Sequence, residues 1–201
     1  MRQISNRKRY YRNEISFNSV KKSRKRNSFI KKFMQWVLLV FIAVIFGYSV
    51  ATFCVGTVTV IGPSMSETLK DNQVVIINKL VYKISDIKRN DIIVFSNLNS
   101  NEYYDIKRVI GLPEETVKIH DGKIYINGEV LEDVPFDEVI LSGGIASDEI
   151  KLGKDEYFVL GDNINNSEDS RYTNVGNISK SNVKGKVTYI LSPKENRAKV
   201  R

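Results

Sequence analysis

Cysteine and histidine are almost absent from this chain of 201 residues, which contains one of each, Cys54 and His120. A single cysteine excludes an intrachain disulfide as a brace for the folded part of the protein. A hydrolase that depends on histidine would have to use His120, so lysine becomes the general base to consider. The single cysteine therefore excludes stabilisation by an intrachain disulfide, and the single histidine makes a lysine base the one to consider.

Acidic residues are scarce at the N-terminus, and this changes how the net charge of +8 is interpreted. Residues 1–32 hold 12 lysines and arginines and a single acid, Glu14. The rest of the chain holds 19 basic and 22 acidic side chains, so the body of the protein is mildly acidic. No nucleic-acid reader motif accompanies the basic tail, and we expect no nucleic-acid partner.

Charged side chains are missing from residues 33–53, a run of about 21 residues. At ~1.5 Å of rise per residue, such a helix spans roughly 30 Å, the thickness of the hydrocarbon core of a bilayer. The alternatives are a buried core helix and a cleavable secretory signal. The run is longer than the ~7–15 apolar residues of a signal, and no small-x-small pattern stands clearly at its end. We predict an uncleaved transmembrane anchor over residues 33–54.

The flanks of the anchor predict its orientation. Seven lysines and arginines lie between residues 21 and 32, whereas no charge follows the anchor until Glu67. The positive-inside bias then predicts a single-pass protein of the plasma membrane, in contact with the lipid bilayer, whose N-terminus is cytoplasmic. The predicted domains are a basic cytoplasmic tail (1–32), the anchor (33–54) and an extracytoplasmic domain (55–201).

Short β-branched runs bounded by polar or turn residues indicate strands beyond the anchor. These runs are Val74–Ile77, Asp91–Phe95, Ile106–Ile110, Tyr157–Leu160 and Val183–Leu191. Residues 132–153 are less regular, and we predict an excursion from the sheet there. The predicted fold class is mostly β, with one N-terminal transmembrane helix followed by an antiparallel, folded or barrel-like β domain.

The clearest strand pattern lies between residues 116 and 131. Two dipeptides, Asp121-Gly122 and Asn127-Gly128, separate three segments of alternating polarity. Both dipeptides suit a tight hairpin turn that needs positive φ, so the pattern predicts a three-stranded meander.

Ser64 and Lys107 are the first candidates for chemistry. Ser64 lies about ten residues after the apolar run, and a serine hydroxyl is a weak nucleophile until a base removes its proton. Lysine is such a base only as the neutral amine, so its pKa has to fall from ~10.4 towards ~7–8, which requires burial. Alternation in the strand would put Lys107 and Arg108 on opposite faces. Arg108 does not deprotonate, so we expect it in a salt bridge or a surface contact.

A polar loop from Gly161 to Arg171 is the third candidate cluster. Its oxygen-bearing side chains would suit a calcium loop, but the spacing and the closing glutamate of an EF-hand are missing. We therefore expect no metal and no cofactor. In a catalytic interpretation, Ser167 orients a lysine amine by a hydrogen bond, while Asp169 and Arg171 pair to brace the loop.

Four segments together resemble the motifs of bacterial type I signal peptidases, membrane-anchored serine proteases that use a Ser/Lys dyad. The segment Ser64-Met65-Ser66-Glu67-Thr68-Leu69 resembles the nucleophile motif, and Asn90–Phe95 resembles the strand that follows it. Lys107–Pro113 resembles the base motif, and Gly161–Arg171 resembles the last conserved loop of the family. The resemblance covers about residues 33–191.

The resemblance implies that Ser64 is the nucleophile and Lys107 the general base, with Ser167, Asp169 and Arg171 in support. The backbone N–H of Ser64 would donate to the oxyanion. The implied substrates are secreted or membrane preproteins with small residues before the cleavage site, bound as an extended strand along a sheet edge. The implied activity is removal of signal peptides through an acyl-enzyme.

Two residues depart from the family pattern. Glu67 stands where the family has proline, and within ~4–6 Å of Lys107 it would favour the charged amine. We predict that Glu67 points away from the site. Gly62 stands where some relatives use a serine hydroxyl in the oxyanion hole, so stabilisation would rest more on the backbone.

Three alternatives compete with this interpretation. The self-cleaving repressors share the Ser/Lys chemistry but are soluble and carry a DNA-binding module. Sortases are anchored and β-rich but need an external cysteine, and Cys54 lies too close to the membrane. A catalytically inactive domain that captures signal segments is the third alternative, and the presence of both Ser64 and Lys107 argues against it.

Overall fold

The computed structural model describes residues 29–96 and 104–200. It divides into two compact units, residues 1–51 and 52–201, which are described separately below. Most of the predicted basic tail over residues 1–32 lies outside the described residues.

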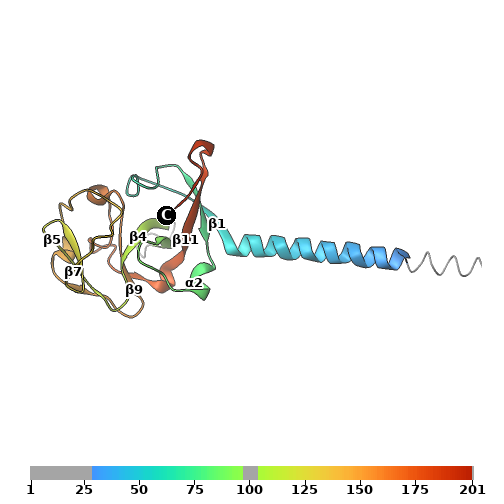
Figure 1. The fold of residues 1–201 in the computed structure, drawn as a ribbon, viewed down its shortest axis with the longest axis horizontal. Helices are drawn as coiled ribbons and strands as arrows, with labels where there is room; N and C mark the ends of the chain where they lie inside the picture. Colours follow the sequence, from blue (N-terminus) through green and yellow to red (C-terminus); the bar gives the residue numbers. More distant parts are fainter. Residues whose placement is uncertain (1–28, 97–103, 201) are drawn as a thin grey trace, which may run out of the picture. The chain divides into compact units, whose positions relative to one another are not determined.

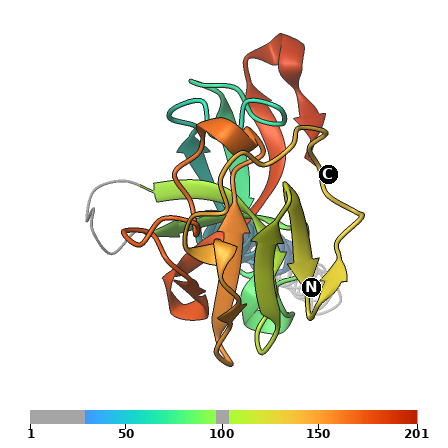
Figure 2. The ribbon, with the colours of Figure 1, turned by 90° about the vertical axis from the view of Figure 1, so that its left-hand side faces the viewer.

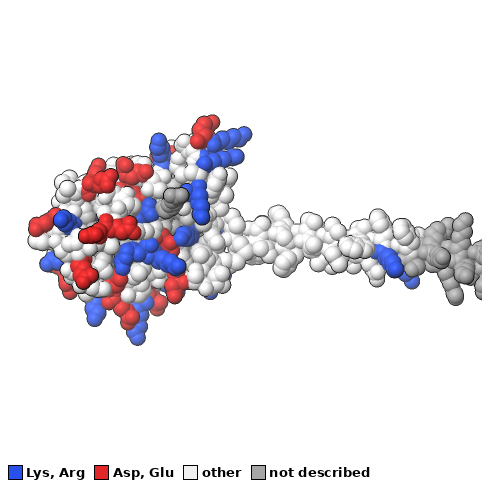
Figure 3. All heavy atoms as spheres, viewed as in Figure 1, with Lys and Arg blue, Asp and Glu red and all other residues white. Residues whose placement is uncertain are grey.

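The described residues of the N-terminal unit belong to one long helix, Phe29–Cys54, which is long and apolar enough to cross a membrane. None of its apolar window is buried against protein, so the structure gives no support to a buried core helix. Figure 3 shows the helix almost free of charged side chains, apart from basic groups near its N-terminal end. Figure 1 shows it as one unbroken coil. The helix is the predicted membrane anchor.

A large antiparallel sheet dominates the second unit, with strand order β1-β2-β11-β3-β4-β9-β10 and β12 paired with β11. Its strands are β1 Val55–Thr59, β2 Val74–Asn78, β3 Ile92–Ser96, β4 Tyr104–Gly111, β9 Glu156–Leu160, β10 Ile178–Ser179, β11 Val183–Ser192 and β12 Ala198–Lys199. Between β2 and β3 lies the four-residue helix α2, Val81–Ile84. In β4, Lys107 pairs with Ile93 of β3. The candidate base therefore lies on an interior strand.

A smaller sheet has the strand order β7-β6-β5-β8. Its strands are β5 Thr116–His120, β6 Lys123–Ile126, β7 Glu129–Val130 and β8 Ile150–Lys151. The turn residues Asp121, Gly122, Asn127 and Gly128 all have positive φ, as tight hairpin turns require. The predicted meander is confirmed. In Figure 2 the β5–β6 hairpin faces the viewer.

The segment 132–153 is more regular than we predicted. It contains the 3₁₀ helix η1, Gly144–Ser147, and the strand β8, whose Ile150 pairs with Val117 of β5. A strand of two residues is too short to give a sequence signal, because its pairing is fixed by the neighbouring strand. The other short 3₁₀ helices are η2 Ile164–Asn166, η3 Lys180–Asn182 and η4 Lys194–Asn196.

An apolar core joins the two sheets. Ile110 of β4 and Phe158 and Leu160 of β9 pack in one buried cluster with Val117 and Ile124 of the small sheet. A second cluster on the large sheet contains Met65 and Leu69, which belong to the turn that carries Ser64. The core thus fixes both the strand that bears Lys107 and the turn that bears Ser64. The antiparallel, mostly β fold class is confirmed.

Candidate active site

Ser64 lies on a tight turn between β1 and β2. Gly62 adopts φ of +85°, and its N–H donates to Asp71 Oδ1 at 2.8 Å. Met65 and Leu69 are buried, and both the Leu69 N–H and the Thr68 N–H donate to the Met65 carbonyl. These bonds hold the turn against the core and leave Ser64 half-buried at the surface.

Lys107 reaches Ser64 from the interior of the large sheet. Its Nζ lies 3.0 Å from Ser64 Oγ, although the two residues are 43 positions apart in the sequence. Only 4% of Lys107 is exposed, and its strand is paired with β3 on one side and β9 on the other. The structure therefore brings together the two residues that the sequence singled out.

Burial lowers the pKa of the Lys107 amine below its ordinary value of 10.5, because an ammonium group loses hydration away from water. The carboxylates of Asp105, Asp169 and Glu168 raise this pKa, and their effect is smaller than that of burial. The net lowering of the pKa increases the share of the neutral amine at a given pH, and the neutral amine is the form that accepts a proton from a hydroxyl.

Arg108, the neighbour of Lys107, forms the salt bridge that was one of its two expected roles. Its Nε and Nη2 donate to the two carboxylate oxygens of Asp162 at 2.8 and 2.7 Å. Thr68 Oγ1 donates to the same carboxylate at 2.5 Å. Arg108 is buried, so the alternative of a surface contact is wrong. The three residues connect the base strand, the nucleophile turn and the last loop.

Asp162 and Thr68 are contributors that the sequence reasoning missed. In the sequence, Asp162 is one of several oxygen-bearing side chains of the loop Gly161–Arg171, and Thr68 is part of the segment that resembles the nucleophile motif. A signal for Asp162 was present, because a buried arginine that cannot deprotonate needs an anionic partner. Sequence alone did not indicate which of the nearby carboxylates that partner would be.

The last loop is braced by a second buried ion pair. Asp169 is fully buried and accepts from Arg171 Nε at 2.8 Å and from Arg171 Nη2 at 2.9 Å. It also accepts from the Gly161 N–H, while Arg171 Nη2 donates to the Ile164 carbonyl. The predicted pairing of Asp169 with Arg171 is present in the structure.

Ser167 differs from the expectation. Its hydroxyl is buried and has no hydrogen-bond partner among the described residues, so the predicted bond to the Lys107 amine is not formed here. The hydroxyl is nevertheless close to the nucleophile segment. A Cβ added to Gly161 would lie 2.2 Å from Ser167 Oγ and 2.5 Å from the Ser64 carbonyl oxygen. Only glycine fits between the two.

Backbone and amide bonds tie the last loop to the nucleophile turn. The Asn163 N–H donates to the Ser64 carbonyl at 3.0 Å, and Asn163 Nδ2 donates to the Pro63 carbonyl and to Ser66 Oγ. Among residues 29–96 and 104–200, no hydrogen bond engages the N–H of Ser64. That donor is free for a ligand.

A cleft of about 250 Å³ opens at the dyad. Its lining residues are Ile61, Gly62, Pro63, Ser64, Asp105, Lys107, Asn166, Glu168 and Val175. Glu67 is not among them. It lines a separate cavity of about 510 Å³ beside Thr68 and Arg108, in agreement with the expected direction of its side chain.

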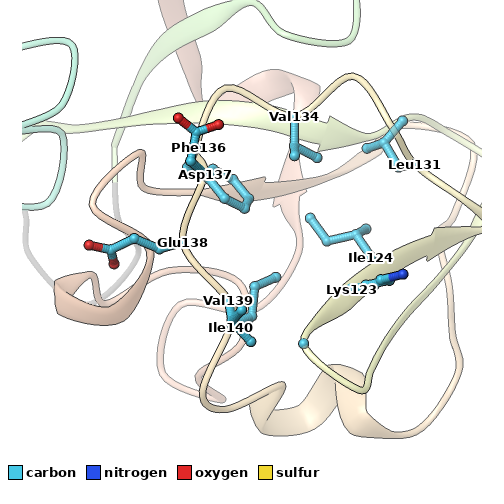
Figure 4. A pocket seen from close by; sticks show the side chains of 10 residues that line it. Lys123, Ile124, Leu131, Val134, Phe136, Asp137, Glu138, Val139 and Ile140 are labelled. Atoms are coloured by element: carbon cyan, nitrogen blue, oxygen red, sulfur yellow. The ribbon is translucent and has the colours of Figure 1, made fainter.

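A cavity of about 190 Å³ near the small sheet carries no comparable chemistry (Figure 4). Six of its ten lining residues are apolar, namely Ile124, Leu131, Val134, Phe136, Val139 and Ile140, and the charged ones are Lys123, Asp137 and Glu138. In the described part of the chain, no group of three or more histidine, cysteine or acidic side chains could hold a metal ion.

The sequence profile of the family described as signal peptidase, peptidase S26, matches residues 33–192, the larger part of the chain. The chain belongs to the peptidase S26 signal peptidase family. This match confirms the resemblance inferred from the four motifs. Signal peptidase I is a membrane-bound serine endopeptidase that acts on preproteins with signal peptides. The family match excludes the alternatives of a self-cleaving repressor and a sortase.

Individual signal peptidases are similar to this chain. Signal peptidase I from Bacillus amyloliquefaciens is 32% identical over 182 residues, which are 87% of this chain and 96% of that relative. Signal peptidase I T from Bacillus subtilis (strain 168) is 31% identical over 189 residues, 90% of this chain and 94% of that relative. A crystal structure of a signal peptidase I from Enterococcus faecalis V583 is 33% identical, with a TM-score of 0.43, and covers 52% of this chain and 99% of that chain.

Proposed function

We propose that this signal peptidase cleaves preproteins with Ser64 as the nucleophile and Lys107 as the general base. The observation that carries the proposal is the distance of 3.0 Å between Lys107 Nζ and Ser64 Oγ. A neutral amine at this distance accepts the hydroxyl proton, and burial favours the neutral form by lowering the pKa of Lys107.

The proposed reaction has two halves. Lys107 takes the proton of Ser64 Oγ while the oxygen attacks the scissile carbonyl, and the resulting oxyanion accepts a hydrogen bond from the Ser64 N–H. The Lys107 ammonium then gives its proton to the departing amine, which leaves an ester on Ser64. Water, deprotonated by Lys107, attacks this ester, and the proton returns to Ser64 as the signal peptide departs.

The supporting residues act on the geometry of the dyad. Asp169 and Arg171 hold the last loop in place, and the loop in turn holds the Ser64 carbonyl through the Asn163 N–H. Ser167 would orient the Lys107 amine once substrate reorders the site, since its buried hydroxyl has no other partner among the described residues.

Substrates in this proposal are secreted or membrane preproteins with small residues before the cleavage site, bound as an extended strand. The apolar helix would anchor the protein in the plasma membrane by a single pass, with its basic N-terminus in the cytoplasm. The domain from residue 55 onward would then meet signal segments as they emerge on the outer face. No nucleic acid is a partner in this proposal.

Incubation of the detergent-solubilised full chain with a preprotein bearing an Ala-x-Ala site tests the proposal. Wild type should cleave once, after the second alanine, and Ser64→Ala and Lys107→Ala should each lose roughly 10³-fold or more in kcat/KM. Glu129→Gln, on the outer strand β7, is the matched control and should cleave like wild type.

Two results would oppose the proposal in different ways. Retained cleavage by either dyad variant would refute the assigned chemistry. Binding of the preprotein by wild type without any cleavage would favour the alternative of an inactive domain that captures signal segments.

A further inference from the structure

The cleft at the dyad has an uneven distribution of charge. Its charged lining residues are two acids, Asp105 and Glu168, and one base, Lys107. When Lys107 is neutral, as the proposed reaction requires, the described lining residues include two carboxylates and no cation. A substrate side chain that enters the cleft therefore meets a negative potential during catalysis.

Glu168 is exposed, and its carboxylate accepts a hydrogen bond from a neighbouring turn. Asn174 Nδ2 donates to Glu168 Oε1. Asn174 lies in the segment 172–176, in which the Val175 N–H and the Gly176 N–H both donate to the Tyr172 carbonyl. The segment is therefore a compact turn, and a carboxylate bound to it loses less freedom when it meets a ligand.

Val175 anchors the same turn to the body of the protein. Its side chain packs against the buried cluster that contains Ile93 of β3 and Val109 of β4, the strand that carries Lys107. Val175 also lines the cleft, together with Ile61 and Pro63 of the nucleophile turn. The turn that positions Glu168 thus also shapes the space next to Ser64.

We infer that Glu168, positioned by the turn 172–176, selects substrates with a basic side chain next to the scissile bond. This inference rests on the proposed function of the dyad and adds a substrate class to it. The small residues of the cleavage site remain necessary, and the basic residue occupies either the variable position between them or one of the first two positions after the cut.

Two further features concern Glu168 and its neighbour Ser167. Ser167, which precedes Glu168, keeps a buried hydroxyl without a partner among the described residues, and Gly161 leaves room for it beside the Ser64 carbonyl. Glu168 also acts electrostatically on Lys107, so its charge is felt at the reacting atoms. A cation held there would compete with this effect.

A peptide series with an Ala-x-Ala site tests the inference on the detergent-solubilised full chain. Each peptide carries Lys, Gln or Glu at x or at one of the first two positions after the cut. For wild type, we expect one position where kcat/KM for Lys exceeds that for Glu by roughly 5- to 10-fold, since exposed charge pairs contribute little individually. The ratio should fall as salt is added.

Substitutions at Glu168 and Asn174 then test whether Glu168 causes the preference for Lys over Glu. Glu168→Gln should reduce the Lys-to-Glu ratio, and Glu168→Lys should invert it. Asn174→Ala should give an intermediate ratio, mainly through KM, because the carboxylate remains but is no longer held. Glu129→Gln removes an acid of the small sheet and should leave the ratio at the wild-type value.

The outcomes separate this inference from the proposed function. Cleavage of the Gln peptides with no charge preference at any position overturns the selection by Glu168 and leaves the dyad intact. A preference that survives Glu168→Lys also overturns it. Failure of wild type to cleave any peptide overturns both proposals.

Discussion

The two sheets differ in what they bury. All buried polar and charged side chains of the described residues belong to the large sheet and its loops, and they are Gln73, Asp91, Lys107, Arg108, Asp162, Ser167, Asp169, Ser170 and Arg171. The buried residues of the small sheet, such as Val117 and Ile124, are apolar. Buried charge costs stability unless it is paired, so its concentration around one serine marks the functional region.

Lys107 should show this cost most clearly. Lys107→Met removes the base, and kcat/KM for a preprotein should fall roughly 10³-fold or more. The same change should raise the free energy of unfolding at neutral and lower pH, because folding no longer requires a lysine to give up its proton or to be buried with its charge. Cleavage assays and thermal unfolding of the detergent-solubilised chain measure the two effects.

The linkage between proton binding and folding determines whether the free energy of unfolding rises or falls with pH. The pKa of Lys107 is lower in the folded state than in the unfolded chain, so the unfolded chain binds more protons between that pKa and 10.5. The free energy of unfolding of wild type should therefore rise with pH through this window, and its deficit relative to Lys107→Met should shrink. A deficit that grows with pH would contradict the assignment.

Arg108 should have the next largest effect. Arg108→Met leaves the Asp162 carboxylate buried and unpaired, which should cost about 3–5 kcal/mol of the free energy of unfolding. Denaturant unfolding measures this loss. The double variant Arg108→Met/Asp162→Leu should recover much of it, because both charges are gone. A double variant as unstable as the single one would show that the pair itself was not the cause.

The small sheet should respond differently. Ile124→Val removes one methyl group from its core and should cost about 0.5–1.5 kcal/mol of the free energy of unfolding. The pH profile of kcat/KM should keep its wild-type shape, because no titratable group near Lys107 changes. A moved profile would mean that the small sheet takes part in tuning the dyad, and the comparison between the sheets would fail.

The smallest expected effect is a shift in the pH profile of kcat/KM, and it should differ between two glutamates near the catalytic residues. Glu168→Gln removes one of the charges that raise the pKa of Lys107, so the ascending limb of kcat/KM should move to lower pH. Glu67→Gln should leave the limb nearly unmoved, because Glu67 lines a different cavity. For Glu67, a shift approaching one pH unit would refute this reasoning, whatever happens at Glu168.

Much of the fold was predictable because its signals are local. The uncharged run gave the helix, and Asp121-Gly122 and Asn127-Gly128 gave the meander through their turn conformations. The two-residue strand β8 gave no signal, because its pairing with β5 depends on residues far away in the sequence. Ser64 and Lys107 were recognised from motifs, since neither residue is distinctive alone.

The remaining parts of the site depend on contacts between distant segments. The bond from Arg108 to Asp162 joins residues 54 positions apart, and nothing local distinguishes Asp162 from its acidic neighbours. The missing partner of Ser167 is a matter of side-chain geometry in a packed loop. The direction of Glu67 was predicted from the chemistry that a nearby acid would impair, which is a functional argument.

The pH dependence of kcat/KM for a cleavable Ala-x-Ala peptide tests the central claim, a buried lysine that acts as the base for Ser64, most directly. We expect an ascending limb whose midpoint lies below the ordinary lysine value of 10.5, because burial lowers the pKa of Lys107. In a profile of kcat/KM, the midpoint of this limb reports the pKa of the base in the free enzyme. A midpoint at or above 10.5, or a profile without an ascending limb, would contradict the account.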